Sequence, residues 1–190
     1  MLEQLLNLDD IILLAVNGLH SPFFDVIMWH VSSRAIWIPL YAVLLYILYR
    51  KLGWRKTLLW TAGIAIVILL TDQTCAHGLR HLFCRMRPSN PDNPISPFVH
   101  IINNYRSGQY GFPSAHSGNT WALTVYLAWI LRKRALTYTL AGWATLVCYS
   151  RMYLGVHYLG DLLGGFVVGA FYATLIYVLI SYADKRFHWT

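Results

Sequence analysis

Three polar residues stand close together in the otherwise apolar stretch CYSRMYLGVHYLGDLLGG, residues 148–165. His157 and Asp161 are four residues apart, so a helix would place them on one face, one turn apart. A carboxylate in that position can accept a hydrogen bond from one imidazole nitrogen and leave the other nitrogen free as a nucleophile. Arg151 adds a planar set of N–H donors that matches phosphate oxygens. A histidine held by an acid beside an arginine indicates phosphate chemistry.

A second stretch, RHLFCRMRP at residues 80–88, adds more anion-binding groups. Arg80 and Arg87 are seven residues apart, so a continuous helix would present both on one face. Two guanidinium groups there can hold one anionic head group through charge-assisted, bidentate hydrogen bonds. Arg85 is expected to point elsewhere, as a cationic side chain at a helix end that reaches toward the membrane surface.

A third stretch, GFPSAHSG at residues 111–118, is typical of the start of a helix. The backbone N–H groups of such a start, together with the Ser114 hydroxyl, form an anion site. His116 in the first turn can donate a proton to a leaving oxygen. Taken alone, the stretch would be a helix cap followed by a surface histidine. The two other stretches favour the catalytic interpretation.

The composition predicts that these residues belong to a membrane protein. Of the 190 residues, 57% are hydrophobic and only 12% are charged, against about 25% charged in soluble domains. The net charge of +7 does not predict nucleic-acid binding, because the basic residues lie in short clusters between apolar runs. These clusters, at residues 50–56, 132–134 and 185–186, are typical of cytoplasmic loops.

The apolar runs predict an all-α membrane bundle with five to six spanning helices, forming a single domain over residues 1–190. Residues 1–34 are expected to be an interfacial segment that begins with an amphipathic helix. The motifs occupy a core of residues 54–180. Spanning helices are expected at 35–51, 54–83, 116–131, 135–154 and 159–183, with a sixth if one N-terminal piece crosses.

One long loop, residues 88–115, has prolines at positions 88, 91, 94 and 97. A proline at every third position predicts an extended, semi-rigid segment. The basic loops alternate along the chain with the regions that hold the three motifs. If the basic loops face the cytoplasm of a bacterial-type inner membrane, the motifs meet at the opposite, outer face.

In their order, the three stretches resemble the signature of the type 2 phosphatidic acid phosphatase (lipid phosphate phosphatase) superfamily, in its bacterial integral-membrane branch. That signature reads Lys-x6-Arg-Pro, then Pro-Ser-Gly-His, then Ser-Arg-x5-His-x3-Asp. The chain has Arg80-x6-Arg87-Pro88, Pro113-Ser114-Ala115-His116 and Ser150-Arg151-x5-His157-x3-Asp161. Arg80 in place of lysine keeps the charge, and Ala115 in place of glycine adds a methyl group that restricts the backbone.

The resemblance implies a role for each matching residue. His157 would be the nucleophile that forms a phosphohistidine, with Asp161 orienting it, and His116 would protonate the leaving oxygen and then activate water. The phosphoryl oxygens would be held by Arg80, Arg87, Ser114, Arg151 and the backbone near Ala115. No metal and no cofactor are expected, because Asp72 and Asp92 are too isolated to form a magnesium site.

The substrate implied is a membrane lipid phosphate or diphosphate, with undecaprenyl diphosphate and lipid A as the leading choices. Phosphatidylglycerophosphate, phosphatidic acid and transfer of the phosphate to a second lipid remain alternatives. Vanadium haloperoxidases share a similar signature, but they are soluble. A transporter would explain Asp72 in an apolar helix and the glycines of the last helix, but not three ordered motifs.

Overall fold

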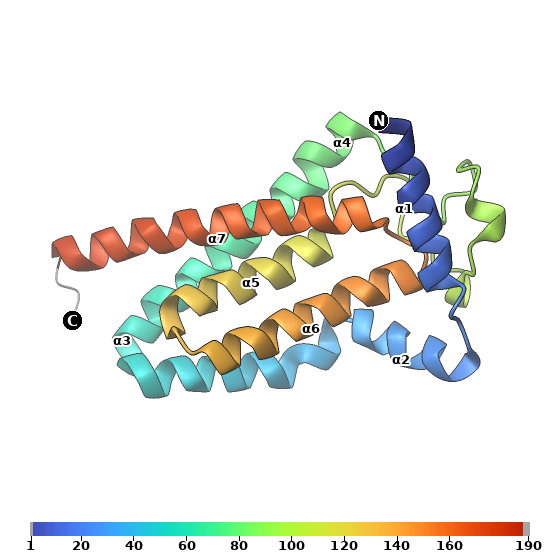
Figure 1. Cartoon of the computed structure of the whole chain (residues 1–190). Helices are drawn as coiled ribbons and strands as arrows, with labels where there is room; N and C mark the ends of the chain where they lie inside the picture. Colours follow the sequence, from blue (N-terminus) through green and yellow to red (C-terminus); the bar gives the residue numbers. More distant parts are fainter. Residues whose placement is uncertain (1, 188–190) are drawn as a thin grey trace.

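The computed structural model describes residues 2–187 and shows a bundle of helices (Figure 1). The all-α prediction is confirmed for this part of the chain. A short 3-10 turn, Ala35–Trp37, leads into α3, and a π-helical turn, Thr74–Leu79, joins α3 to α4. The helices are α1 Leu2–Asn17, α2 Pro22–Ser32, α3 Ile38–Gln73, α4 Arg80–Phe83, α5 Ala115–Leu131, α6 Arg134–Tyr153 and α7 Leu159–Phe187.

Helix α3 consists of two arms that meet at Gly53, where φ is 75° and ψ is 172°. Glycine adopts this positive φ without steric cost, which explains the break predicted between the spans 35–51 and 54–83. Within residues 2–187, two stretches are long and apolar enough to cross a membrane, Ala35–Phe83 and Leu159–Arg186. The pair α1 and α2, bent by 116°, adds a third if it counts as one span. The count of five to six spans therefore stays a prediction.

Helices α5 and α7 pack closely because small residues face each other along their contact. A methyl group on Gly169 would overlap the carbonyl oxygen of Gly118, and one on Gly165 would overlap the carbonyl oxygen of Ser114. Small residues of this kind let two helix backbones approach each other in membrane proteins. The close approach brings the start of α7 beside the start of α5, where two of the three motifs lie.

The basic clusters gather at the end of the bundle away from the motifs. Lys56 forms an ion pair with Asp184 at 3.5 Å, and Arg132 donates a hydrogen bond to the Tyr177 hydroxyl at 3.3 Å. Figure 1 shows the bend of α3, the α5–α6 turn and the C-terminal end of α7 at one end, with α1, α2 and the long loop at the other. Basic loops and motifs are thus at opposite ends, as the alternation along the chain predicts.

The two N-terminal helices dock onto the end of the bundle that holds the motifs. The Asn17 side chain donates a hydrogen bond to the Tyr153 carbonyl at 2.8 Å and accepts one from the His100 main chain at 2.7 Å. Leu13 on the same helix is fully buried, whereas Ile11 is 65% exposed. Helix α1 therefore has one face on the protein and an apolar face that is open to its surroundings.

The proline-rich part of the long loop differs from the prediction, because it is a chain of tight turns and not an extended segment. The main-chain N–H groups of Asn90, Asn93, Ser96 and Val99 each donate to the carbonyl three residues earlier. Each proline is thus the second residue of a four-residue turn, where its fixed φ is favoured. The threefold spacing of proline reflects this repeat of turns.

We expect Gly169→Ala to destabilise the protein by about 1–3 kcal/mol, because the added methyl group would force α5 and α7 apart. Gly142→Ala is the matched control, since no atom lies within 4 Å of a methyl group at that position and alanine favours a helix. Thermal midpoints in detergent would test this. Equal midpoints for the two variants would contradict the proposed packing.

Candidate active site

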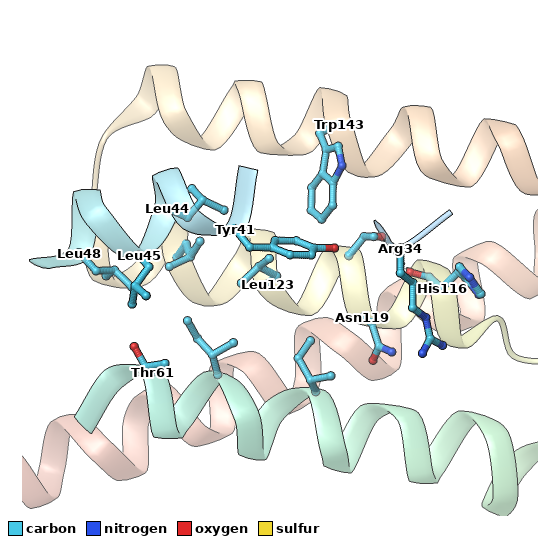
Figure 2. Close-up of a pocket in the computed structure, with 14 residues that line it drawn as sticks. Arg34, Tyr41, Leu44, Leu45, Leu48, Thr61, His116, Asn119, Leu123 and Trp143 are labelled. Atoms are coloured by element: carbon cyan, nitrogen blue, oxygen red, sulfur yellow. Dashed lines mark hydrogen bonds between the residues drawn. The ribbon is translucent and has the colours of Figure 1, made fainter. Parts of the chain in front are cut away.

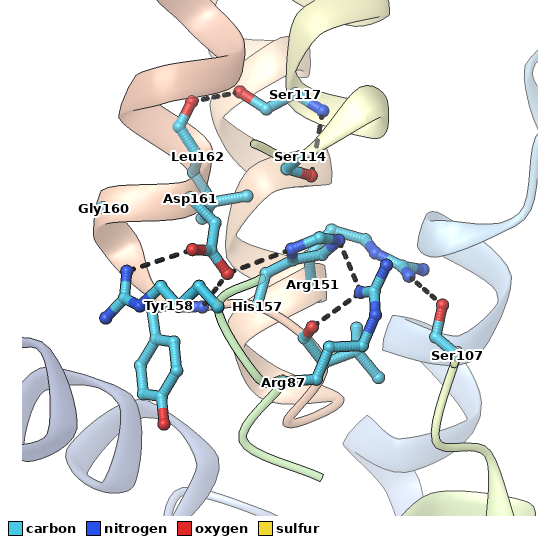
Figure 3. Close-up of polar contacts among 12 residues, drawn as sticks. Arg87, Ser107, Ser114, Ser117, Arg151, His157, Tyr158, Gly160, Asp161 and Leu162 are labelled. Carbon is cyan, nitrogen blue, oxygen red and sulfur yellow. Dashed lines mark hydrogen bonds and ion pairs between the residues drawn. The ribbon is translucent and has the colours of Figure 1, made fainter. Parts of the chain in front are cut away.

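The centre of the site is His157, in the turn between α6 and α7, with Asp161 in the first turn of α7 (Figure 3). The Nδ1 atom of His157 lies 3.3 Å from Oδ2 of Asp161, and the main-chain N–H of Tyr158 donates to the same oxygen at 3.1 Å. Asp161 is fully buried and His157 is 1% exposed. The i, i+4 contact predicted from the sequence is therefore present.

The contacts of His157 define its tautomer. Because a carboxylate only accepts hydrogen bonds, Nδ1 carries the proton and Nε2 has a free lone pair. Arg87 Nη1 lies 2.8 Å from this Nε2 and also donates to the Val156 carbonyl at 2.8 Å. The nitrogen suited to nucleophilic attack thus faces a guanidinium group.

Burial and nearby cations keep His157 neutral. Burial lowers the pKa of His157 well below its ordinary value of 6.5, and the positive charges of Arg87 and Arg151 lower this pKa further. Burial likewise lowers the pKa of Arg87 to about 10, with the charges of Arg80 and Arg151 adding to the effect. Arg87 is still charged at neutral pH, so an uncharged nucleophile stands beside a permanent cation.

Helix α5 begins beside this pair. Ser114 caps the helix: its hydroxyl oxygen accepts from the Ser117 N–H, and its own N–H donates to the Asp161 carbonyl at 2.9 Å. The N–H groups of Ala115 and His116 follow in the first turn, where a helix provides no acceptor of its own. Ser114 therefore serves the helix start here, and the first-turn amides are the groups suited to an anion.

Arg80 and Arg87 do not lie on one continuous helix, so the shared helix face that their seven-residue spacing would allow does not form. Helix α4 ends at Phe83, because Cys84 adopts a left-handed conformation with φ of 46°. Arg87 lies beyond it, in a segment whose main-chain N–H donates to the Gln109 carbonyl at 2.9 Å. The turn brings Arg87 onto His157, and Arg80 stays close enough to lower the pKa of Arg87.

Three arginines of the motifs have an unused donor. The Nε atoms of Arg80, Arg87 and Arg151 are buried and have no hydrogen-bond partner within the described residues. Buried polar groups are nearly always paired in native proteins, so three such donors at one site indicate a place for an anion. The long loop, residues 88–115, packs closely against the site. A Cβ atom on Gly111 of this loop would lie 2.8 Å from Asp161 Oδ2.

Arg151 is held by residues that the sequence reasoning did not single out. It donates to the Ser32 hydroxyl in α2, and its Nη2 lies 3.4 Å from the Tyr105 hydroxyl and 3.5 Å from the Ser107 hydroxyl. Ser32 is in the N-terminal segment, and the other two are in the long loop. Their sequence surroundings carry no recognisable pattern, and only the fold brings them to Arg151.

Arg85 was expected to point away from the site, and this prediction is wrong. Its Nη1 atom donates to Oδ1 of Asp161 at 3.0 Å, and its Nη2 donates to Asp9 of α1 at 2.8 Å. The guanidinium also lies 4.1 Å from the ring centre of Tyr158. Arg85 is therefore a further cation at the site, bound to the oxygen of Asp161 that His157 does not contact.

Two cavities meet at Arg34 and His116, which line both. The smaller, of about 270 Å³, is also lined by Arg151, Ser32 and Tyr105. The larger, of about 440 Å³, lies between both arms of α3, α5 and α6 (Figure 2). Its walls are mostly apolar and include Leu44, Leu48, Ile64, Ile68, Leu123 and Leu127. A cavity with mostly polar lining residues beside His116 thus continues into an apolar one.

The fold, the site and the sequence now define a family. Residues 58–185 match the PAP2 superfamily. The chain is 43% identical to the lipid A 4′-phosphatase of Bacteroides thetaiotaomicron over 186 residues, covering 98% of this chain and 83% of that protein. It is 29% identical to the lipid A 4′-phosphatase of Porphyromonas gingivalis over 97% of this chain and 78% of that protein. The chain belongs to the PAP2 superfamily and is an integral-membrane hydrolase of the phosphatase class.

Solved structures show the same fold. The transmembrane PAP2-type phosphatidylglycerolphosphate phosphatase of Bacillus subtilis superimposes with a TM-score of 0.66 at 23% identity, covering 97% of this chain and 88% of that one. LpxE of Aquifex aeolicus superimposes with a TM-score of 0.64 at 21% identity, covering 87% of this chain and 92% of that one. The resemblance to the superfamily is therefore confirmed by sequence and by fold.

The low pKa of His157 predicts that the protein loses stability in acid. Below pH 6.5 the unfolded chain binds a proton at this histidine and the folded chain does not, so stability falls by about 1 kcal/mol for each pH unit below 6.5. The thermal midpoint of His157→Gln should fall less than that of the wild type between pH 7.5 and 5.5. Equal falls in both proteins would contradict a neutral His157.

Proposed function

We propose that the chain is a lipid phosphate phosphatase that removes the 4′-phosphate of lipid A through a phosphohistidine intermediate. The observation that carries the mechanism is the buried pair of His157 and Asp161, next to three arginines with unpaired Nε–H groups. The choice of lipid rests on the 43% identity to a lipid A 4′-phosphatase over nearly the whole chain.

In the first step, the oxygens of the substrate phosphate accept hydrogen bonds from Arg80, Arg87 and Arg151 and from the first-turn amides of α5. Arg87 thereby turns its N–H group from Nε2 of His157 to a phosphate oxygen. The Nε2 lone pair forms a bond to phosphorus while the bond from phosphorus to the lipid oxygen breaks. His116, which takes up a proton when the phosphate dianion binds beside it, gives this proton to that oxygen. Donors fixed in place stabilise the charge that spreads over the equatorial oxygens.

In the second step, water replaces the histidine. His116, now neutral, takes a proton from a water molecule, whose oxygen forms a bond to phosphorus as the bond to Nε2 breaks. Asp161 holds the Nδ1 proton throughout and stabilises the positive charge that the imidazole carries in the intermediate. Inorganic phosphate leaves, and both histidines return to their starting states.

The two cavities fit the two parts of a lipid phosphate. The phosphate would lie in the polar cavity beside Arg151 and His116, and an acyl chain would lie in the apolar cavity between α3, α5 and α6. Ligand sites commonly combine an apolar wall with a few converging polar groups. His116 lines both cavities, which suits a group that protonates the oxygen joining phosphate to lipid.

The arrangement of charge supports a site at the outer face of a bacterial-type inner membrane. The basic clusters of residues 50–56, 132–134 and 185–186 gather at the end opposite the site. Basic residues mark the cytoplasmic ends of spanning helices. The site would then face the periplasm, and residues 1–34 would lie in the interface of the outer leaflet.

Undecaprenyl diphosphate is the second candidate substrate. The chain is 30% identical to the undecaprenyl-diphosphatase of Sulfolobus acidocaldarius over 148 residues, which cover 74% of this chain and 61% of that protein. Arg34, which lines both cavities, would be placed to contact the phosphate that stays on the lipid. Transfer of the phosphate to a second lipid would follow if an alcohol replaced water in the second step.

Phosphate release by the purified protein in detergent, with a chelator present, tests the proposal. The substrates would be lipid A, undecaprenyl diphosphate, phosphatidylglycerophosphate and phosphatidic acid, and we expect the highest kcat/KM for lipid A. His157→Ala and His116→Ala should each lower kcat at least about 100-fold. Release by His157→Ala at the wild-type rate would refute the mechanism, and a preference for another lipid would refute the choice of substrate.

Narrowing the apolar cavity should impair the hydrolysis of lipid substrates and leave that of short, water-soluble substrates unchanged. Leu123→Trp fills space between α3 and α5, so we expect KM for lipid A to rise about 10-fold, because an acyl chain no longer fits. Hydrolysis of a short, water-soluble phosphate ester should not change. Leu175→Trp, at a position 39% exposed on α7, is the control. A rise in KM with both substrates would contradict the proposal that this cavity holds the acyl chain.

A further inference from the structure

Helix α1 reaches the catalytic carboxylate through one arginine. Arg85 lies between two acids, with Nη1 at 3.0 Å from Asp161 Oδ1 and Nη2 at 2.8 Å from Asp9 Oδ2. All three side chains are largely buried: Asp9 is 13% exposed, Arg85 20% and Asp161 0%. Asp9 precedes residues 58–185, which match the superfamily. The network therefore joins an element outside the matched region to the centre of the site.

Arg85 gives Asp161 a counter-charge on the side away from His157. A buried carboxylate without a partner is strongly destabilised, and protonation would remove the acceptor for the Nδ1 proton of His157. With Arg85 on Oδ1, the other oxygen can accept from His157 and from the Tyr158 N–H. The position of the Arg85 guanidinium therefore decides how the carboxylate is oriented toward the nucleophile.

Asp9 fixes Arg85 and the start of α7 at once. One of its oxygens pairs with Arg85, and its carboxylate accepts the Gly160 main-chain N–H at 3.0 Å. That N–H belongs to the first turn of α7, where no acceptor within the helix exists and a negative charge is favoured. A Cβ atom on Gly160 would lie 2.7 Å from Asp9 Oδ2, so glycine is needed for this approach. One side chain thus holds both the arginine and the helix that carries Asp161.

We propose that Asp9 is a positioning residue for catalysis, acting through Arg85 on Asp161 and so on the orientation of His157. The proposal rests on the phosphatase function proposed above. Asp9 does not reach the phosphate, so its loss lowers kcat and leaves KM unchanged. Helix α1 is thereby part of the working enzyme, although it lies outside the matched region.

Asp9→Asn isolates the ion pair, because asparagine still accepts from the Gly160 N–H but carries no charge for Arg85. We expect kcat for lipid A to fall about 10-fold, since small errors in the placement of reacting groups are costly. KM should stay within about twofold, and the thermal midpoint should be close to that of the wild type. Asp9→Glu should recover most of the activity. Glu3→Gln, at an exposed position on the same helix, is the control and should match the wild type.

A double substitution tests whether Asp9 acts through Arg85. If it does, Asp9→Asn lowers kcat in the wild-type background and has no further effect in Arg85→Gln. An equal loss in both backgrounds, or a wild-type kcat for Asp9→Asn, would overturn the proposal. A rise in KM with unchanged kcat would also overturn it, because that would place Asp9 in substrate binding.

Binding of orthovanadate, a phosphate analogue that can bond to Nε2 of His157, provides a readout independent of turnover. We expect Asp9→Asn to weaken vanadate binding about 10-fold and Glu3→Gln to leave it unchanged. If no lipid releases phosphate but vanadate binding still depends on Asp9, the proposed function fails and the positioning role stands. Unchanged vanadate affinity in Asp9→Asn would overturn the positioning role.

Discussion

The carboxylate of Asp161 is the constraint on which the rest of the site depends. It is fully buried, and leaving such a charge without a partner costs on the order of 3–5 kcal/mol. The fold satisfies it with the His157 imidazole, the Tyr158 N–H and the Arg85 guanidinium. Because Arg85 occupies Oδ1, while His157 and the Tyr158 N–H share Oδ2, the imidazole is held in an orientation in which Nδ1 is occupied and Nε2 faces away from the carboxylate.

This arrangement requires helix starts and a loop to meet at one end of the bundle. Glycines between α5 and α7 allow the two helix starts to approach, and the left-handed turn at Cys84 sends Arg85 and Arg87 to opposite sides of the His157–Asp161 pair. The cationic side chains beside the pair raise the potential at the place where a phosphate would bind. Together with burial, the same charges keep His157 neutral, so the groups that would bind the phosphate also favour the nucleophilic form of the histidine.

Much of the site could be predicted from the sequence because its residues lie in short motifs with fixed spacing. The four-residue separation of His157 and Asp161 predicts their contact, and the three-part signature predicts the superfamily. The sequence does not predict the contacts of Arg85, because a catalytic-site cation near a helix end has the same local sequence pattern as one that reaches toward the membrane surface. Prolines at every third position predict an extended segment, but the same spacing also fits the succession of turns that the structure shows.

The sequence alone determined the all-α class, the membrane character, the break at Gly53 and the family. These follow from composition and from spacings of less than ten residues, which local backbone geometry converts directly into structure. Only the tertiary structure decided that Ser32 and Arg34 reach the site from the N-terminal segment, that Asp9 pairs with Arg85, and that an apolar cavity opens beside His116. Such contacts join residues far apart in the chain. They depend on how whole helices pack against each other, and a local sequence pattern does not predict this packing.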